Sequence, residues 1–215
     1  MSGAKFMKKT ALSILMTVFA ACTGSAIALG VVPEKTYKAS AESIQVEVGV
    51  SEADYSVATA SVRLPDETYD SGALRYHVKM SVEKYNSIFN ADGSVKEANT
   101  KTGALILPAY LMGEATELTP STPSVMDVNT TSAWDPVYKA DGSVDYYEVK
   151  VCLTGIPQPN HSSKLVVRSY IKDASGNYAY TTQKDSTSIS DVALSVYNKA
   201  NTSDADNDVL KTTYL

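Results

Sequence analysis

The chain has 215 residues with 19 basic and 24 acidic side chains, so its formal net charge is −5 at neutral pH. Nucleic acids and anionic membranes attract basic surfaces, and this charge therefore argues against both as partners. A chain of this length can bury the core of a single domain.

Residues 1–41 have the features of a Sec signal peptide. Three lysines precede an uncharged, largely apolar run over residues 11–32, and Ala39, Ser40 and Ala41 supply the small residues that signal peptidase accepts. Cleavage there predicts an exported product, outside the cell or on its surface, with a net charge of −9 because five lysines and one glutamate are lost. The alternative is an uncleaved membrane anchor, since the apolar run of 22 residues is long enough to span a bilayer.

From Glu42 onward, apolar and polar residues alternate with a period of two, which is typical of strands with one buried face. The clearest segment places Leu74, Tyr76, Val78, Met80 and Val82 on one face. Comparable segments cover residues 44–50, 56–64, 147–153 and 165–171. Strands with one apolar, buried face and one polar, solvent-exposed face are typical of antiparallel sheets.

Two segments lack this alternation. Residues 103–112 form a continuous apolar run, in which Pro108 favours an edge strand or a bulge. Residues 114–132 are rich in Thr, Ser and Pro and are predicted to form a long loop.

The region from Lys164 to Tyr197 contains a hairpin followed by a helix. The turn residues 173–177 separate a strand from a second one that extends to Thr182. Ser188 stands three residues before Asp191, which is the spacing of a helix capping box, and apolar residues then follow helical spacing up to Ala200. We expect this helix to cover an end or an edge of a sheet.

These patterns predict a mainly β domain over residues 42–200: an antiparallel two-sheet immunoglobulin-like sandwich of about seven strands with one C-terminal helix. Residues 201–215 are predicted to be an acidic, weakly structured tail. Asp204, Asp206 and Asp208 have the opening spacing of a calcium loop, but Val209 and Leu215 replace its required Gly and Glu.

A short motif recurs along the chain. Ala-Asp-Gly-Ser-Val occupies residues 91–95 and again residues 140–144, and residues 173–177 are a looser version. We interpret all three as turns and not as calcium loops. Their similarity is explained by convergence on the Asp and Gly residues that turns favour.

No motif for catalysis, metal binding or cofactor binding is recognisable, so the sequence predicts neither metal nor cofactor and no enzyme. His77 lies on the polar face of a strand and His161 lies in a Pro-rich loop, where single histidines are usually structural. Cys152 lies in a strand pattern and is expected to be a small buried side chain.

Aromatic residues give the one positive functional signal. Trp134, Tyr138, Tyr146 and Tyr147 cluster around one predicted hairpin, and such rings suit stacking on sugars or contact with proteins. Tyrosines also favour strands for packing reasons alone, which is the simpler explanation.

Several segments resemble an uncharacterised immunoglobulin-like module of secreted and surface proteins from clostridia-like Gram-positive bacteria. The resemblance runs through residues 59–64, 71–76, 103–108, 167–171 and 188–193. The chain departs from the module's pattern where Tyr76 replaces Phe, Ala104 replaces Thr and Thr187 replaces Arg. The resemblance implies an accessory domain outside the cell and carries over no catalytic residue.

Two functional hypotheses follow. The first is a non-catalytic secreted or surface module that contacts a glycan, the cell wall or another protein. The second is a small secreted hydrolase with an unrecognised site, since a fold alone does not exclude catalysis. The first predicts an exposed aromatic surface, whereas the second predicts convergent carboxylates or a partner for His77.

Overall fold

The computed structural model describes residues 48–65, 71–199 and 203–215. The predicted signal peptide over residues 1–41 and the start of the first predicted strand lie outside these ranges. Among the described residues, no helix is both long enough and apolar enough to cross a membrane.

The described ranges contain ten strands, three α-helices and two short 3-10 helices. The strands are β1 (Val48–Gly49), β2 (Tyr55–Arg63), β3 (Ala73–Ser81), β4 (Lys101–Pro108), β5 (Met126–Asn129), β6 (Asp135–Tyr138), β7 (Val144–Thr154), β8 (Leu165–Lys172), β9 (Tyr178–Tyr180) and β10 (Lys184–Thr187). The helices are α1 (Val82–Ile88), α2 (Ile189–Tyr197), α3 (Asp204–Tyr214), η1 (Ala109–Leu111) and η2 (Gln158–Asn160).

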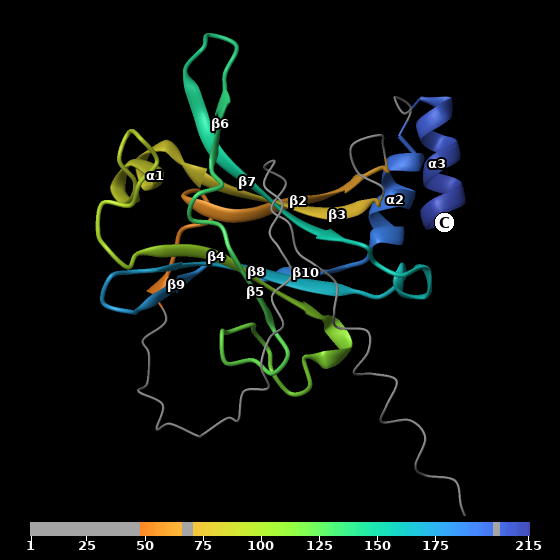
Figure 1. Ribbon diagram of the computed structural model, residues 1–215, viewed down its shortest axis with the longest axis horizontal. Helices are drawn as coiled ribbons and strands as arrows, with labels where there is room; N and C mark the ends of the chain where they lie inside the picture. Colours follow the sequence, from red (N-terminus) through yellow and green to blue (C-terminus); the bar gives the residue numbers. More distant parts are fainter. Residues whose placement is uncertain (1–47, 66–70, 200–202) are drawn as a thin grey trace, which may run out of the picture.

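The strands form two sheets that lie one above the other (Figure 1). Six strands form the first sheet in the order β1-β9-β8-β4-β5, with β10 also pairing with β8, and four form the second in the order β2-β3-β7-β6. The pairs are antiparallel except β1 with β9. The prediction of a mainly β fold with antiparallel sheets is confirmed.

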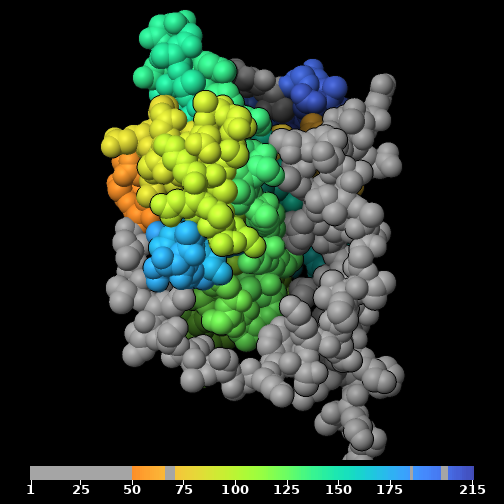
Figure 2. Space-filling view, turned by 60° about the vertical axis from the view of Figure 1, so that its left-hand side comes forward, coloured from red at the N-terminus to blue at the C-terminus, as the bar shows by residue number. Residues whose placement is uncertain are grey.

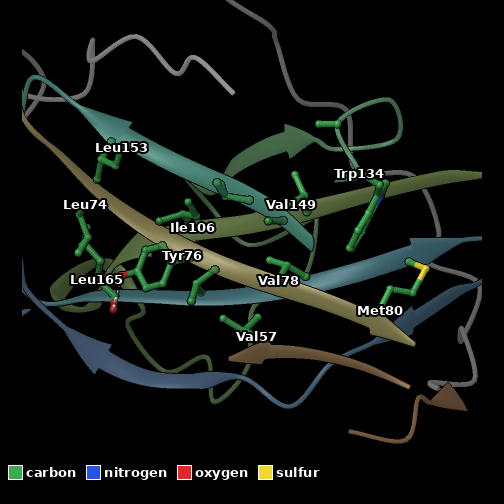
Figure 3. Packing of buried hydrophobic residues seen from close by; sticks show 14 of the residues in the cluster. Val57, Leu74, Tyr76, Val78, Met80, Ile106, Trp134, Val149, Leu153 and Leu165 are labelled. Atoms are coloured by element: carbon green, nitrogen blue, oxygen red, sulfur yellow. Dashed lines mark hydrogen bonds between the residues drawn. The ribbon is translucent and has the colours of Figure 1, made fainter. Parts of the chain in front are cut away.

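The main apolar core lies between the two sheets (Figure 3). Four of the five alternating residues that were predicted to face it are buried: Leu74, Tyr76, Val78 and Met80. The fifth, Val82, is half-buried at the start of α1. Two tyrosines also reach across from the second sheet to the first, since the Tyr55 hydroxyl donates to the Tyr170 carbonyl at 3.3 Å and the Tyr76 hydroxyl to the Leu165 carbonyl at 3.5 Å. Burial raises the pKa of both hydroxyls, which therefore remain protonated donors.

The prediction that Pro108 marks an edge strand or a bulge is wrong, since β4 pairs with β8 in an unbroken register through Pro108. Strand β4 lies between β8 and β5, and Pro108 is its last residue, where a missing N–H does not interrupt the ladder. The run is apolar throughout because β4 is buried on both faces. Ile106 faces the main core, whereas Leu105 and Leu107 belong to a second cluster with Leu118 and Tyr180 on the opposite face of the sheet.

Other differences concern short elements. The described chain has more strands than the seven predicted, because β5, β6 and β10 are only four residues long and carry little periodicity. Strand β5 lies inside the segment predicted as a loop over residues 114–132, and it pairs with β4. Helix α1 also adds to the single helix predicted, and it begins at Ser81, whose hydroxyl accepts the Lys84 N–H at 3.1 Å.

The predicted capping box at the start of α2 is confirmed. The Ser188 hydroxyl oxygen accepts the Asp191 N–H at 3.1 Å, and the Asp191 carboxylate accepts the Ser188 N–H at 2.8 Å. Ile189, Val192 and Ala193 then join the main core. Helix α2 packs against β2 and β3 and so covers one end of the sheets, as expected (Figure 1).

Asp191 makes the stability of this helix start depend on pH. The hydrogen bond from Lys164, followed by those from Ser188, holds the pKa of the Asp191 carboxyl below its ordinary value. Its contribution is therefore complete above the pKa of an unfolded aspartate, about 3.9, and is lost as the pH falls through the lower folded-state pKa. We expect Asp191→Asn to lower the urea midpoint at pH 7 and to unfold together with the parent chain once the parent carboxyl is protonated.

The matched control for this experiment is Asp145→Asn. Among the residues that the structure describes, the Asp145 carboxylate pairs with Lys139 alone, at 3.8 Å and exposed to solvent, so its replacement should change the midpoint little at any pH. A gap between Asp191→Asn and the parent that persists unchanged into strong acid would contradict the assignment to the carboxylate.

The predicted acidic tail is instead helix α3. The Ser203 hydroxyl accepts the Asp206 N–H at 3.1 Å, and Asp204 and Asp206 occupy the first turn, where negative charge favours a helix. One turn apart, Leu210 and Tyr214 are buried in the main core. The acidic residues that suggested disorder are thus the start signal of a helix whose other face packs on the domain.

Candidate functional site

Trp134, the centre of the predicted aromatic surface, is part of the core. Only 9% of its surface is exposed, and its ring lies 6.0 Å from the ring of Tyr55. Its indole N–H donates to the Thr102 hydroxyl at 3.0 Å, and that hydroxyl also accepts from Thr130 at 3.1 Å. The hypothesis that Trp134 stacks on a ligand is therefore wrong, because the segment after β5 turns the ring inward between the sheets.

The three predicted tyrosines differ in accessibility. Tyr147 packs on the edge of the core and stacks on Tyr85 with an interplanar angle of 7°. Tyr146 points to the opposite face of the same strand, where the Lys79 ammonium lies 4.3 Å from its ring centroid. Tyr138 is 61% exposed. Only Tyr138 presents a largely free ring, at the end of the hairpin of β6 and β7 that projects beyond the sheets (Figure 1).

The recurring Asp-Gly motif forms turns of one geometry. The turns span residues 90–94, 139–143 and 173–177. In each of them the fourth residue is a glycine with positive φ: Gly93 at 80°, Gly142 at 84° and Gly176 at 92°. Each turn is closed by a backbone hydrogen bond: Asn90 N–H to Ser94 O at 2.7 Å, Lys139 N–H to Ser143 O at 2.8 Å and Asp173 N–H to Asn177 O at 2.9 Å. The interpretation of all three as turns is confirmed.

In each of these turns an aspartate carboxylate accepts the backbone N–H of the last residue. Asp92 accepts the Ser94 N–H and Asp141 the Ser143 N–H, both at 2.9 Å, and Asp173 accepts the Asn177 N–H at 2.8 Å. The side-chain hydrogen bonds from Ser94, Ser143 and Asn177, each followed by the backbone bond, lower the pKa of the three carboxyls. The turns are therefore rigid and negatively charged.

The three turns lie at the same end of the molecule. Ser81 at the end of β3 pairs with Tyr146 at the start of β7, and Lys101 at the start of β4 pairs with Lys172 at the end of β8. Figure 2 shows this end, with α1 and the following loop in yellow, the β8–β9 turn in light blue and the projecting hairpin at the top. We call the turns at residues 90–94, 139–143 and 173–177, together with Tyr138, the loop end.

A row of polar side chains crosses the outer face of the four-stranded sheet. Ser61 on β2, His77 on β3 and Glu148 on β7 come from three neighbouring strands. The Ser61 hydroxyl oxygen lies 2.8 Å from His77 Nε2, and His77 Nδ1 lies 3.1 Å from Glu148 Oε1. All three side chains are partly buried. Sequence reasoning missed this row because 16 residues separate Ser61 from His77 and 71 separate His77 from Glu148; only the strand register brings them together.

Two arginines flank this row. Arg75 is the register partner of Ser61, and its guanidinium donates to the Val62 carbonyl at 3.3 Å. Within the described part of the chain, Arg75 Nε is buried with no hydrogen-bond partner. Burial, followed by repulsion from Arg63, lowers the pKa of Arg75. A positive group with an unused donor thus lies on the same face as the Ser61 hydroxyl.

His161 lies at the opposite end, beside an open cavity of about 430 Å³ between α3 and the loops that precede β3 and β8. Its Nε2 lies 3.0 Å from the Ile156 carbonyl, and its ring packs against Tyr214. Tyr214 fills the space beside Gly72, where a Cβ would lie 1.3 Å from the Tyr214 hydroxyl. These contacts are those of a structural residue, because they hold α3 against the loop that precedes β8.

The described residues contain no cluster of three or more His, Cys, Asp or Glu side chains arranged to hold a metal ion. No protein-family model matches the chain, and no curated protein or solved structure is detectably similar to it.

Proposed function

We propose that this chain is an exported immunoglobulin-like contact module that binds a cell-wall glycan through its loop end. The observation that carries the proposal is that three closed turns from distant parts of the sequence lie at the same end of the molecule as the projecting hairpin of Tyr138, which is 61% exposed. Export rests on the signal-peptide pattern of residues 1–41.

The strand order supports the immunoglobulin-like part of the proposal. In that fold, strands A, B, E and D form one sheet, and C, F and G, extended by C′, form the other. Taking β2, β3, β7 and β6 as A, B, E and D gives the order of the four-stranded sheet. Taking β9, β8, β4 and β5 as G, F, C and C′ gives the order of the other sheet.

This correspondence also matches the three turns of the loop end to connections of the immunoglobulin fold. The turn at residues 90–94 lies in the B–C connection, residues 139–143 form the D–E turn and residues 173–177 form the F–G turn. In variable immunoglobulin domains, the B–C and F–G loops at this end contribute to the binding surface. The opposite end is covered by α2 and α3. We place the ligand at the loop end because its turns and Tyr138 are largely exposed to solvent.

The side chains of the loop end suit a polar ligand with flat apolar faces. Tyr138 offers an aromatic ring for stacking, while hydroxyl, amide and carboxylate groups surround the turns. Sugars combine a C–H face with many hydroxyl groups, so they match this composition better than an extended apolar protein surface does. A neutral or basic glycan is favoured because the three turn aspartates are ionised.

Retention on purified, insoluble cell-wall polysaccharide tests the proposal. We expect Tyr138→Ala to weaken retention by about tenfold, which is about 1.4 kcal/mol, whereas Tyr138→Phe keeps the ring and retains most of the binding. The matched control is Tyr110→Ala, because Tyr110 is 65% exposed on η1, away from the loop end.

Equal retention of the parent and Tyr138→Ala would overturn the role of the loop end. Retention that survives removal of the glycan but is lost after protease treatment of the wall would identify the ligand as a protein instead.

A further inference from the structure

We propose that Ser61 is an acyl-accepting nucleophile, activated by His77 and oriented through Glu148, and that it acts on small carboxylic esters. The site lies on the outer face of the four-stranded sheet, separate from the loop end, so the inference does not depend on the proposed glycan binding. It rests on the two contacts in the row, 2.8 Å from Ser61 Oγ to His77 Nε2 and 3.1 Å from His77 Nδ1 to Glu148 Oε1.

These contacts have the connectivity that activates a serine. The carboxylate of Glu148 accepts a hydrogen bond from Nδ1–H, which fixes the tautomer in which Nε2 is the free acceptor. Nε2 then faces the Ser61 hydroxyl and can take its proton. Glu148 is itself held by Lys150, whose ammonium lies 3.7 Å from Oε2, so Oε1 remains directed at the imidazole. Nucleophile, base and orienting group therefore stand in the required order.

The reaction has two balanced steps. Ser61 Oγ attacks the ester carbonyl while its proton passes to His77 Nε2, and the alcohol leaves with that proton as the C–O bond breaks. Water then attacks the acyl-serine, His77 removes a proton from the water, and Ser61 leaves with it as the carboxylic acid forms. Each cycle consumes one ester and one water and needs no cofactor.

Arg75 supplies the charge that the intermediate requires. The carbonyl oxygen becomes negative during attack, and preorganised donors in a partly buried site stabilise such an oxyanion. Arg75 is the cross-strand partner of Ser61, so its guanidinium places a positive charge on the same face of the sheet. The same positive charge favours esters with an anionic group near the carbonyl.

The experiment treats the purified full chain with a fluorophosphonate probe, which phosphonylates an activated serine with loss of fluoride, and locates the adduct by peptide mass spectrometry. We expect a single major adduct on Ser61. His77→Gln should slow labelling by about 10²–10⁴-fold, the usual contribution of a general base. Ser56→Ala is the matched control, because Ser56 lies on the same strand and the same face, opposite Lys79, and its loss should leave labelling unchanged.

Glu148 is tested as a positioning residue by a pair of variants. Glu148→Gln should lower the labelling rate by roughly tenfold or more, and Glu148→Asp should restore part of it, because only a carboxylate fixes the imidazole tautomer. Circular dichroism of each variant separates this effect from unfolding. Absence of a Ser61 adduct in the folded parent chain, or labelling of Ser61 at an equal rate in folded His77→Gln, would overturn the proposal.

Discussion

Replacement of Trp134 by alanine is expected to destabilise the fold by about 3–5 kcal/mol, the range for removing a buried Trp side chain from a core. The indole fills the space beside Tyr55 between the sheets, and its N–H is a partner of the buried Thr102 hydroxyl. The variant loses both the packing and the hydrogen bond. Urea unfolding followed by circular dichroism gives the free energy of unfolding for parent and variant.

Two further variants separate the causes. Trp134→Phe keeps much of the ring volume and should cost less than the alanine variant, with about 1 kcal/mol assigned to the missing N–H donor. Tyr138→Ala, on the same hairpin region but exposed, should stay within about 0.5 kcal/mol of the parent. A Trp134→Ala chain as stable as Tyr138→Ala would place the indole outside the core. This difference is also why Tyr138, and not Trp134, is the residue for binding experiments.

Replacement of Arg168 by methionine is expected to cost about 3 kcal/mol, since it leaves several buried acceptors without their charged donor. Arg168 is only 6% exposed and donates to the Leu118 and Thr181 carbonyls, each at 3.1 Å, and to the Glu117 carboxylate at 2.9 Å. Its guanidinium also lies over the Tyr180 ring at 4.3 Å. These contacts hold the segment after η1 against the outer face of the six-stranded sheet.

Hydrogen exchange shows where the loss falls. In Arg168→Met, amide protons around Leu118 should exchange faster, while those of β3 and β7 keep their protection. Glu117→Gln is the matched control: the Glu117 side chain is half exposed, so its ion pair should be worth less than about 1 kcal/mol. Equal destabilisation by the two variants would assign the effect to the ion pair instead of the backbone carbonyls.

The sequence predicts those parts of the fold in which local pattern and tertiary packing agree. Strand β3 alternates because one face meets the core, and α2 begins at Ser188 because its cap is local. Predictions failed where a distant segment changes the environment. Leu105 and Leu107 are buried by the segment around Leu118, which made β4 look unlike a strand with one wet face. Helix α3 was missed because Leu210 and Tyr214 are too few to show periodicity.

The candidate sites show the same division. The three Asp-Gly turns were predictable because a turn depends on consecutive residues, but their gathering at one end depends on strand register. The inward position of Trp134 also depends on register and on the buried Thr102 hydroxyl. The row of Ser61, His77 and Glu148 forms only when β2 pairs with β3 and β3 pairs with β7. No local sequence pattern predicts both pairings.

The self-contained closure of the three turns bears on how this domain can change. Each turn is held by its own backbone hydrogen bonds, its glycine and its aspartate, and none of these belongs to the apolar interior. Residues at their tips can therefore be exchanged one turn at a time while the interior stays intact. Such a scaffold is suited to diversification, by natural variation among strains or by randomised libraries that select new specificities on a constant frame.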